Sequence, residues 1–524
     1  IHTNTITTSG TQIYGNATSD TIVIGTATTL TTTNSQITFT GLVDSEGSET
    51  NNLTLAVGNS EVEFDAAVGA TTPLGAIAIT GALDLDAIIQ KTSGSAAGAT
   101  SLTVSTTSNL GANVNTSGIQ TYTGAVTLSG ANRTLKGSTI TTQGTLGGAF
   151  ALTITGNAVF GNSAADDVVL TGSDKALEVS GTTTIVTDTI TTSGTQTYTG
   201  AVTLNTSTTL TAASDTITFS STVNAADTTD KDLTFGSGTG TVTFTGAVGA
   251  VSTNLGTITN IASQTLIFAD AVTATTIANY GTLLFNATSA KTISSNITDN
   301  GTTVLQVINS ADNAPGIITF SGNIVADTIT IGTTANAGSA LFNGTVTHSS
   351  TSNINIVGGN VNAEDSLANF ANTVTVTAIT LDDNSGDATA TFSGSSKTIT
   401  GTINGVGATE GTVTVTGTPT FASTIGNSNR TAQLTIGGAT TFEAAVQTAA
   451  LTTTAAISGG TTLNVSTTSN LGGNVTTSGA QTYTGAVTLS GGARTLQGST
   501  ITTQGTLAGG SQNLIITGNA VFGD

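Results

Sequence analysis

The chain has 524 residues, 7% of them charged, and its 30 acidic and nine basic residues give a formal net charge of −21. This balance argues against nucleic acid and against a polybasic membrane-surface patch, because both interactions need a basic surface. Cys, Met and Trp are absent, which excludes disulfides, thiolate metal sites and cysteine nucleophiles. The sequence has no run of about 18 apolar residues, so we expect no transmembrane helix.

The composition favours an all-β protein. Thr and Val branch at Cβ and fit strands better than helices, and 64 glycines interrupt the chain at short intervals. With so few charges, the water-facing surface has to consist mostly of Thr, Ser, Asn and Gly. No linker or change of composition divides the chain, so we predict one continuous β-solenoid over residues 1–524.

Sequence repeats extend along the chain. A degraded copy opens it at residues 1–14, the full module occupies residues 103–161, and a partial copy lies at residues 185–204. The full module returns at residues 464–523, displaced by 361 positions and then by 362 after a one-residue insertion. Repetition on this scale is typical of an elongated repeat architecture. Because the chain starts and stops inside such repeats, we expect it to be a segment of a longer protein.

Short runs in which aliphatic residues alternate with Thr or Ser, and which end in Gly, Asn-Gly or Ser-Gly, predict strands. Clear examples are residues 202–204, 216–219, 241–244, 373–376 and 412–415.

Eleven of the 16 phenylalanines recur with a loose period, and most of the intervals between these eleven lie between 21 and 29 residues. One turn of a parallel β-helix, with three short strands and three corners, uses roughly that number of residues. We therefore predict a parallel β-helix of about 22 turns, in which Phe side chains stack as an internal ladder about 4.8 Å apart. Tandem β-sandwich domains are the alternative, although they usually show modules of about 100 residues joined by linkers. The ladder should contain Phe39, Phe64, Phe219, Phe244, Phe268, Phe320, Phe342, Phe370, Phe392, Phe421 and Phe442.

Candidate catalytic residues are few. Asp84 and Asp86 should face the same side of a strand, and carbohydrate-cleaving β-helix enzymes use such a carboxylate pair. A basic residue and aromatic sugar platforms, which usually accompany such a pair, are scarce here, so a polar surface is the favoured interpretation. His2 and His348 are the only histidines, and no Ser/His/Asp set can be assembled around them. We expect His348 to be an exposed residue at a strand end, and we expect no enzyme.

One loop could bind calcium. The sequence from Asp382 to Asp387 places several oxygen-bearing side chains around a glycine turn. Ca²⁺ takes six to eight oxygen ligands in flexible loops, so Asp382, Asp383 and Asp387 are candidate ligands. Asx residues also favour turns in any case, and the nonapeptide of calcium-binding β-rolls is absent, so a solvated turn is the other interpretation. A similar group, in which a lysine competes for the charge, is Asp227, Asp230, Lys231 and Asp232.

Four of the five tyrosines stand at one repeated position, in the phrase Ser-Gly-x-Gln-x-Tyr: Tyr14, Tyr122, Tyr198 and Tyr483. A ligand contact, a contact between chains and a structural ladder would each explain the repetition. We favour a structural role, with the ring against the turn and the hydroxyl reaching water.

The duplicated module also compares two basic positions. Lys136 becomes Gln497 in the second copy, whereas Arg133 is kept as Arg494. Lys136 is therefore not expected to belong to a shared site, and the retained arginine should pair with an acidic neighbour or occupy a corner.

The phrase at residues 193–204, Ser-Gly-Thr-Gln-Thr-Tyr-Thr-Gly-Ala-Val-Thr-Leu, and its relatives beginning at Ser117 and Ser478 resemble repeats of filamentous-haemagglutinin-like adhesins. So does the phrase at residues 64–74, which has an echo at residues 244–249. The resemblance implies a right-handed parallel β-helix that is exported through the outer membrane and serves in adhesion or as a surface coat. The family's secretion domain and Asn-Pro motifs are not found in this chain, so export by a two-partner pathway is implied by the resemblance alone.

Together these patterns predict a structural segment of a giant bacterial extracellular protein, forming a shaft, coat or filament at the cell surface. Its expected partners are neighbouring segments of the same long chain or further copies of it, with a cell surface or glycan as other candidates. Two alternatives stay open. A dedicated adhesin would carry its binding loop in the least repetitive regions, residues 293–317 and 363–381, and a polysaccharide-active β-helix enzyme would carry a groove lined by carboxylates.

Overall fold

The computed structural model describes the whole chain except residues 93–95, 214, 309–315, 349–352, 362–363 and 524. The described part contains 58 strands and no helix. The chain divides into two compact units, Ile1–Gln264 and Thr265–Asp524. Each unit is a β-solenoid, and together they have about 23 turns.

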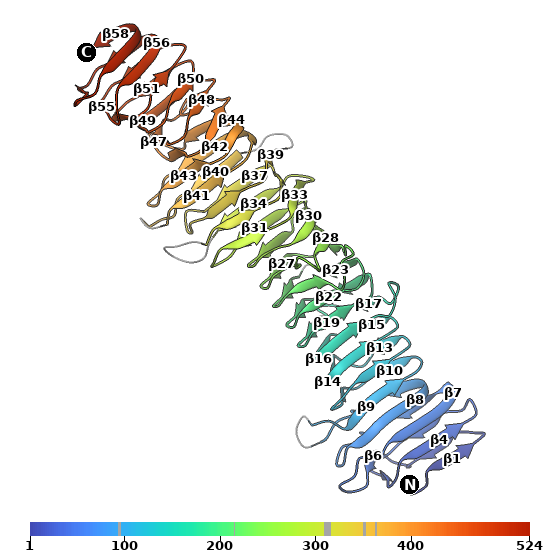
Figure 1. Cartoon of the computed structure of the whole chain (residues 1–524). Helices are drawn as coiled ribbons and strands as arrows, with labels where there is room; N and C mark the ends of the chain where they lie inside the picture. The colour runs from blue at the N-terminus through green and yellow to red at the C-terminus, as the bar shows by residue number, and fades with distance from the viewer. Residues whose placement is uncertain (93–95, 214, 309–315, 349–352, 362–363, 524) are drawn as a thin grey trace. The chain divides into compact units, whose positions relative to one another are not determined.

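All pairings between the strands within each unit are parallel, as Figure 1 shows for the layered arrows. In the described part, antiparallel pairing is confined to two single bridges, Gln90–Ala97 and Thr333–Asn336. The predicted parallel β-helix is therefore confirmed, and the β-sandwich alternative is wrong. A sandwich would need antiparallel strands throughout. The prediction of one continuous solenoid over residues 1–524 stays a prediction.

In the first unit the chain visits three parallel sheets in turn, one strand for each side of a turn. Some long strands bend at a corner and serve two sheets. The first sheet holds β1 (Thr5–Thr8), β4 (Thr28–Thr32), β7 (Leu53–Phe64), β8 (Leu74–Leu85), β9 (Ala99–Val104), β12 (Gln120–Tyr122), β14 (Arg133–Thr142), β16 (Leu152–Phe160), β19 (Thr183–Ile185), β22 (Val202–Leu204) and β25 (Val223–Ala225). The second holds the second halves of β7 and β8 together with β2 (Gln12–Tyr14), β5 (Ile37–Phe39), β10 (Ser108–Leu110), β13 (Val126–Leu128), β15 (Leu146–Gly148), β17 (Val168–Leu170), β20 (Thr189–Thr192), β23 (Thr208–Ala212), β26 (Leu233–Phe235) and β28 (Leu255–Thr259). The third holds the first halves of β14 and β16 together with β3 (Thr21–Ile24), β6 (Leu42–Ser45), β11 (Val114–Asn115), β18 (Leu177–Val179), β21 (Gln196–Tyr198), β24 (Ile217–Phe219) and β27 (Thr241–Phe244).

The second unit has the same plan. One sheet holds β30 (Ala274–Asn279), β33 (Asn296–Asp299), β36 (Ile324–Val325), β39 (Val346–Thr347), β42 (Val374–Asp382), β44 (Ser395–Gly405), β46 (Thr418–Phe421), β48 (Thr440–Phe442), β50 (Ile457–Gly459), β53 (Val475–Thr476), β56 (Arg494–Thr503) and β58 (Leu514–Phe522). Another holds β32 (Lys291–Ile293), β35 (Ile318–Phe320), β38 (Ser339–Phe342), β41 (Ser366–Phe370), β43 (Ala388–Phe392), β45 (Thr412–Val415), β47 (Thr431–Ile436), β49 (Val446–Thr453), β52 (Ser469–Leu471), β55 (Val487–Leu489) and β57 (Leu507–Ala508). The last holds the second halves of β42, β44, β56 and β58 and the first half of β49 together with β29 (Thr265–Phe268), β31 (Thr282–Asn286), β34 (Val304–Ile308), β37 (Thr328–Ile331), β40 (Asn353–Val357), β51 (Leu463–Val465) and β54 (Gln481–Tyr483).

Within each unit the core is a ladder of inward-facing side chains. Strand residues alternate between buried and exposed positions because successive side chains point to opposite faces. In the first unit the rings of Phe39 and Phe64 stack 5.0 Å apart, and those of Phe219 and Phe244 stack 4.9 Å apart. In the second unit Phe342 and Phe370 stack 5.1 Å apart. Stacking of Phe side chains is therefore confirmed, but not as one ladder: Phe39 and Phe64 stack on the second sheet of the first unit, and Phe219 and Phe244 stack on its third.

The duplicated module folds the same way twice. Strands β9 to β16 in the first unit correspond in order to β51 to β58 in the second. Even an irregularity is repeated: the pairing of β14 with β16 shifts register between Lys136 and Thr139, and that of β56 with β58 shifts between Gln497 and Thr500. The local sequence therefore specifies the register of each turn.

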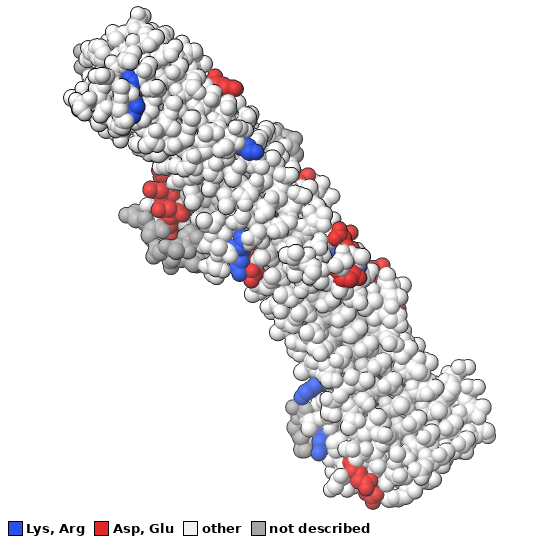
Figure 2. Space-filling model, in the orientation of Figure 1, with Lys and Arg blue, Asp and Glu red and all other residues white. Residues whose placement is uncertain are grey.

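On the face drawn in Figure 2, acidic and basic residues form small separate groups on a surface otherwise built from uncharged residues. The described residues contain no helix long and apolar enough to cross a membrane.

Candidate functional site

The repeated Gln-x-Tyr phrase forms a clasp at a corner of the solenoid. Gln196 in β21 has no exposed surface. Its amide donates at 3.3 Å to the Ile190 carbonyl oxygen and at 3.3 Å to Thr192 Oγ1. It also donates at 2.8 Å to the carbonyl oxygen of Thr211 in the following turn, while Tyr198 donates its hydroxyl to Gln196 Oε1 at 3.0 Å. The glutamine thus joins a corner, a ladder ring and the following turn.

The same clasp is built at three other corners. The next-turn bond of the glutamine amide is 2.9 Å for Gln12, 2.7 Å for Gln120 and 2.7 Å for Gln481. The expectation of a structural role for these tyrosines is confirmed. The expectation that their hydroxyls reach water is wrong, because each hydroxyl donates to the buried glutamine of its own motif. Burial also raises the pKa of the hydroxyl groups of Tyr122, Tyr198 and Tyr483. The hydroxyl donors are Tyr14, Tyr122 and Tyr483, of which the last two, like Tyr198, have no exposed surface.

The retained arginine closes its own corner. Arg133 donates from Nε and Nη2 to the carbonyl oxygen of Ser129, at 3.0 and 2.7 Å. Arg494 makes the same two bonds to Ser490, at 2.9 and 2.5 Å. In the part of the chain that the structure describes, neither forms an ion pair with an acidic residue. Of the two expectations, the corner role is confirmed.

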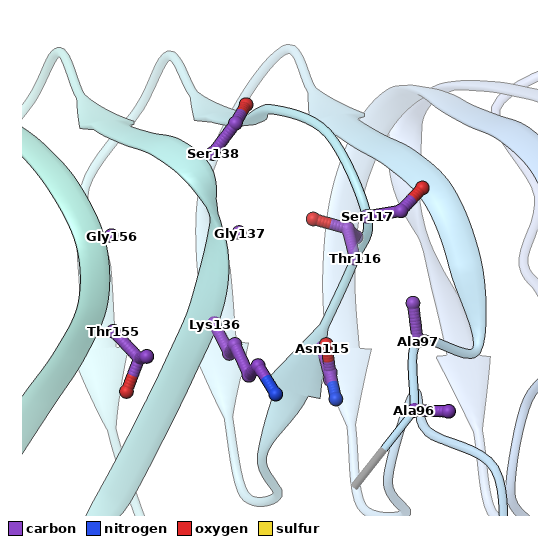
Figure 3. A pocket seen from close by; sticks show the side chains of 10 residues that line it. All are labelled: Ala96, Ala97, Asn115, Thr116, Ser117, Lys136, Gly137, Ser138, Thr155 and Gly156. Atoms are coloured by element: carbon purple, nitrogen blue, oxygen red, sulfur yellow. The ribbon is translucent and has the colours of Figure 1, made fainter.

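A cavity of about 480 Å³ opens beside the corner that precedes β12. Figure 3 shows the side chains of Lys136 and Asn115 extending toward it, while Gly137 and Gly156 contribute bare backbone. A Cβ on Gly156, whose φ is +134°, would lie 1.9 Å from the carbonyl oxygen of Gly137. Only glycine suits this close approach of two turns. Gln497 replaces Lys136 in the second copy, so the basic lining belongs to the first copy alone.

Asp84 and Asp86 belong to a larger acidic group on the outer side of β7 and β8. They share a face, as predicted, because Asp84 lies between two inward-facing leucines and Asp86 follows in phase. Glu63 of β7 pairs in register with Asp84 of β8. One carboxylate oxygen each from Glu63, Asp65 and Asp86 lies within 4.8 Å of the others. Glu63 and Asp65 were missed in the sequence, although they stand one turn before Asp84 and Asp86 and have the same spacing.

The surroundings of Glu63 set its protonation. Burial raises its pKa, a hydrogen bond from Thr38 at 3.1 Å opposes this, and the charges of Asp65 and Asp84 add to the rise. Burial followed by the charges of Asp84 and Asp65 also raises the pKa of Asp86. Three converging carboxylate oxygens hold a proton more readily than an isolated carboxylate does, or can contribute part of the shell of a divalent cation.

The predicted calcium loop is a hydrogen-bonded turn. The two carboxylate oxygens of Asp383 each accept a main-chain N–H group at 2.7 Å. Asp365, one turn earlier, accepts the N–H of Asp387 at 2.9 Å. Among the described residues, Asp382, Asp383 and Asp387 do not form a set with ligand oxygens within 4.8 Å of one another. Calcium binding by these three residues stays a prediction.

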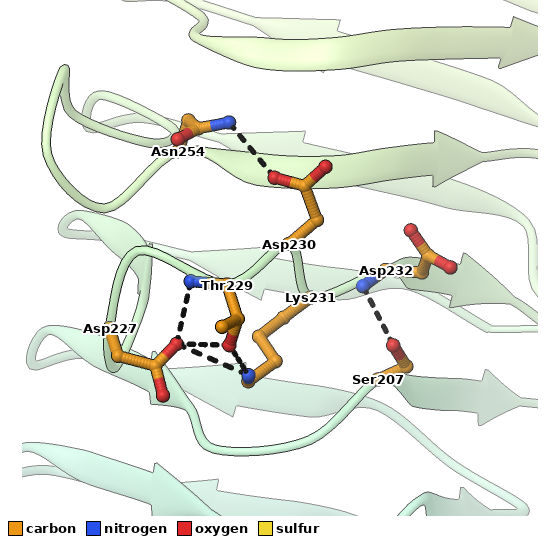
Figure 4. Close-up of polar contacts among 7 residues, drawn as sticks. All are labelled: Ser207, Asp227, Thr229, Asp230, Lys231, Asp232 and Asn254. Carbon is orange, nitrogen blue, oxygen red and sulfur yellow. Dashed lines mark hydrogen bonds and ion pairs between the residues drawn. The ribbon is translucent and has the colours of Figure 1, made fainter.

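The other acidic group does not converge either, as Figure 4 shows. Asp227 accepts the N–H of Thr229 at 2.9 Å, the Thr229 hydroxyl, and Lys231 Nζ at 3.2 Å. These bonds, led by the Thr229 hydroxyl, lower the pKa of Asp227 to about 2. Asp230 and Asp232 bond instead to an amide and an N–H group of the following turn. The expected competition from Lys231 is confirmed.

The two histidines lie in different units. His2 Nδ1 is 3.8 Å from the carboxylate of Glu46. His348 directly follows β39, as expected for a strand-end residue, but it is only partly exposed and its Nδ1 has no hydrogen-bond partner in the described structure.

The regions suggested for an adhesin loop, residues 293–317 and 363–381, fall partly outside the described residues.

Comparisons with protein-family models, with curated proteins and with solved structures find no match for this chain. The parallel strands and the repeated turns by themselves define the class of the protein, which is a β-solenoid repeat protein.

Proposed function

We propose that this chain is a structural segment of a large bacterial extracellular surface protein, forming a shaft, coat or filament and mediating adhesion or assembly through its outer faces. The observation that carries the proposal is the sequence-encoded turn: two copies of one module, each in a different unit, fold with the same strands, clasp and register shift. Such turns can be added without a new fold, because each contacts mainly its neighbours. That property suits a structural protein that is lengthened by adding turns.

The outer surface also supports the proposal. With 7% charged residues and a net charge of −21, the strands present mostly Thr, Ser, Asn and Gly. Such faces can hydrogen-bond to polyols or to other chains without strong long-range electrostatic forces.

Immunogold labelling of intact source cells with antibodies against this chain tests the location. We expect label outside the cell envelope without permeabilisation, and loss of that label after brief protease treatment of whole cells. Label that appears only after permeabilisation would contradict the proposal.

We further propose that the segment acts without catalysis. Two histidines and no cysteine leave few nucleophile and base combinations, and the chain has no tryptophan to stack a sugar beside Glu63 and Asp86. A screen of the purified chain against bacterial and host polysaccharides tests this. Release of new reducing ends, abolished in an Asp86→Asn variant, would favour the polysaccharide-active alternative instead.

A further inference from the structure

One arginine differs from the other two. Arg430 lies in the loop of residues 426–430, just before β47, and lines a cavity of about 260 Å³. The cavity walls come from three successive turns, and their polar side chains include Thr409, Asn427, Ser428 and Gln447.

The guanidinium of Arg430 has no partner among the residues that the structure describes. Its Nε is buried without an acceptor there, and the side chain makes no hydrogen bond or ion pair with any described residue. Arg133 and Arg494, by contrast, each donate a hydrogen bond from Nε to the carbonyl oxygen of a corner residue. Glu410, in the adjoining loop, accepts the N–H of Gly407 at 2.6 Å instead of pairing with Arg430. The two Nη atoms also lack a partner among the described residues and, unlike Nε, are not enclosed, so an acceptor from outside the chain can reach them.

The loop that carries Arg430 is held in place before any ligand arrives. Ser428 donates its N–H to Asn404 Oδ1 at 3.1 Å, and Asn429 donates from Nδ2 to the Val406 carbonyl oxygen at 2.7 Å. Gly426 has a φ of +69°, and a Cβ there would lie 2.0 Å from the Gln447 carbonyl oxygen, so the next turn packs directly on the loop. A site held this way loses little conformational entropy on binding.

We propose that this cavity binds the carboxylate of an acidic sugar, such as a uronic acid unit of a polysaccharide. A carboxylate can accept two parallel hydrogen bonds from the planar fork of the two Nη atoms, which, unlike Nε, are not enclosed. The surrounding hydroxyl and amide groups of Thr409, Asn427, Ser428 and Gln447 can donate to and accept from sugar hydroxyls. The volume suits one sugar unit rather than a longer ligand. The inference rests on the proposed surface function and names a ligand class for it.

Isothermal titration of the full chain with glucuronate tests the site, with glucose, acetate and an acetylated dipeptide as parallel ligands. We expect glucuronate to bind best, because it alone supplies both the carboxylate and the hydroxyls. Arg430→Gln should weaken it by about tenfold to a hundredfold, the value of a charge-assisted pair. Arg430→Lys should restore only part of the affinity, since an ammonium lacks the fork. Lys397→Gln, which removes one positive charge outside the cavity, should bind as the natural chain does.

Several results would overturn the site. They are no binding of glucuronate by the natural chain, equal binding by Arg430→Gln when its thermal melt is unchanged, and equal binding of glucose or acetate. Tighter binding of the dipeptide would assign the cavity to a peptide carboxylate and also overturn the sugar proposal. The titration does not depend on where the protein resides, so failure of the surface location would show separately in the immunogold labelling.

Discussion

At the scale of single residues, the solenoid depends on buried polar groups as well as on its apolar ladder. Gln196 is fully buried, and its side chain makes four hydrogen bonds. Because its amide nitrogen and oxygen both have partners, burying this polar group does not leave a donor or acceptor unsatisfied. The side chain acts as a fastener between turns because one of its acceptors belongs to the next turn. A hydrophobic residue could fill the same space, but it could not hold the corner's carbonyl and hydroxyl groups.

Removing one hydroxyl from the clasp should be costly where water cannot replace it. Tyr198→Phe leaves the buried Gln196 Oε1 without its donor, so we expect a loss of about 1–3 kcal/mol in local unfolding free energy. Amide hydrogen exchange of β21 measures this value. Tyr14→Phe is the matched control, since Tyr14 makes the equivalent bond at 2.8 Å but is partly exposed. An equal effect at both positions would contradict the burial argument.

The acidic group predicts a pH dependence of stability. Because the pKa values of Glu63 and Asp86 are raised in the folded chain, the fold binds these protons more tightly than the unfolded chain does. The associated stability is fully present below the ordinary carboxyl pKa of about 4 and is lost as pH rises through the raised values. A Glu63→Gln, Asp86→Asn variant should therefore unfold at a higher temperature than the natural chain at pH 7.

The difference between this variant and the natural chain should shrink as the pH falls and disappear at about pH 2, well below the ordinary carboxyl pKa, where both carboxyl groups are protonated in either state. Asp227→Asn is the opposite control, because the pKa of Asp227 is lowered to about 2 and its charged form favours the fold. That variant should melt lower than the natural chain at pH 7. Thermal melts followed by circular dichroism across this pH range check both signs, and a double variant that melts lower at pH 7 would refute the argument.

At the scale of strands, aromatic rings on neighbouring parallel strands stack on one another. Phe219 stacks on Tyr198 at 5.2 Å and on Phe244 at 4.9 Å, so the motif tyrosine and the ladder share one column. In-register parallel strands bring equivalent side chains to the spacing between strands, which suits nearly parallel, offset rings. In the second unit the column also changes sheet, as Phe392 meets Phe421 edge-on with an interplanar angle of 83°.

Deleting a ring from the middle of this column should create a cavity bounded by two other rings. Phe219→Ala is expected to cost about 3–5 kcal/mol of local unfolding free energy, the usual range for a buried Phe. Hydrogen exchange of β24 and its neighbours measures the loss. Val251→Ala, at a position that is 96% exposed, should change it by no more than about 0.5 kcal/mol. A small effect of Phe219→Ala would mean that the turns collapse onto the gap.

At the scale of the whole molecule, each unit is a sum of similar turns. Hydrogen bonds join residues about one turn apart, so neither unit needs a contact between distant parts of its sequence. The same corner phrase turns from β1 to β2, from β11 to β12 and from β20 to β21, which lie at three different corners of the first unit. The three corners are therefore nearly equivalent, and a repeat can start on any side.

A whole turn should be removable. Thr183 and Val202 are register partners, so deleting residues 183–201 places β22 on β16 and keeps every later strand on its sheet. We expect this variant to retain its circular dichroism spectrum and a melting temperature close to that of the natural chain. Deleting only residues 183–190 should abolish folding locally, since it puts the outward-facing Thr191 in an inward position. Equal tolerance of both deletions would contradict the model of independent turns.

Local sequence patterns were enough to establish the all-β class, the parallel β-helix and most of the ladder, because period-two alternation and the spacing of Phe recur in each turn. Phe285 escaped this reasoning, since it follows Phe268 too closely for the usual period, in a shortened turn. The polar contacts were decided by the tertiary structure alone. Glu63 meets Asp86 across a turn, a tyrosine hydroxyl finds a glutamine instead of water, and one arginine of three lacks an acceptor among the described residues. The acidic contact and the arginine without a described acceptor depend on which groups successive turns bring within contact distance. The tyrosine and the glutamine stand two residues apart in one motif and meet because the corner encloses both side chains.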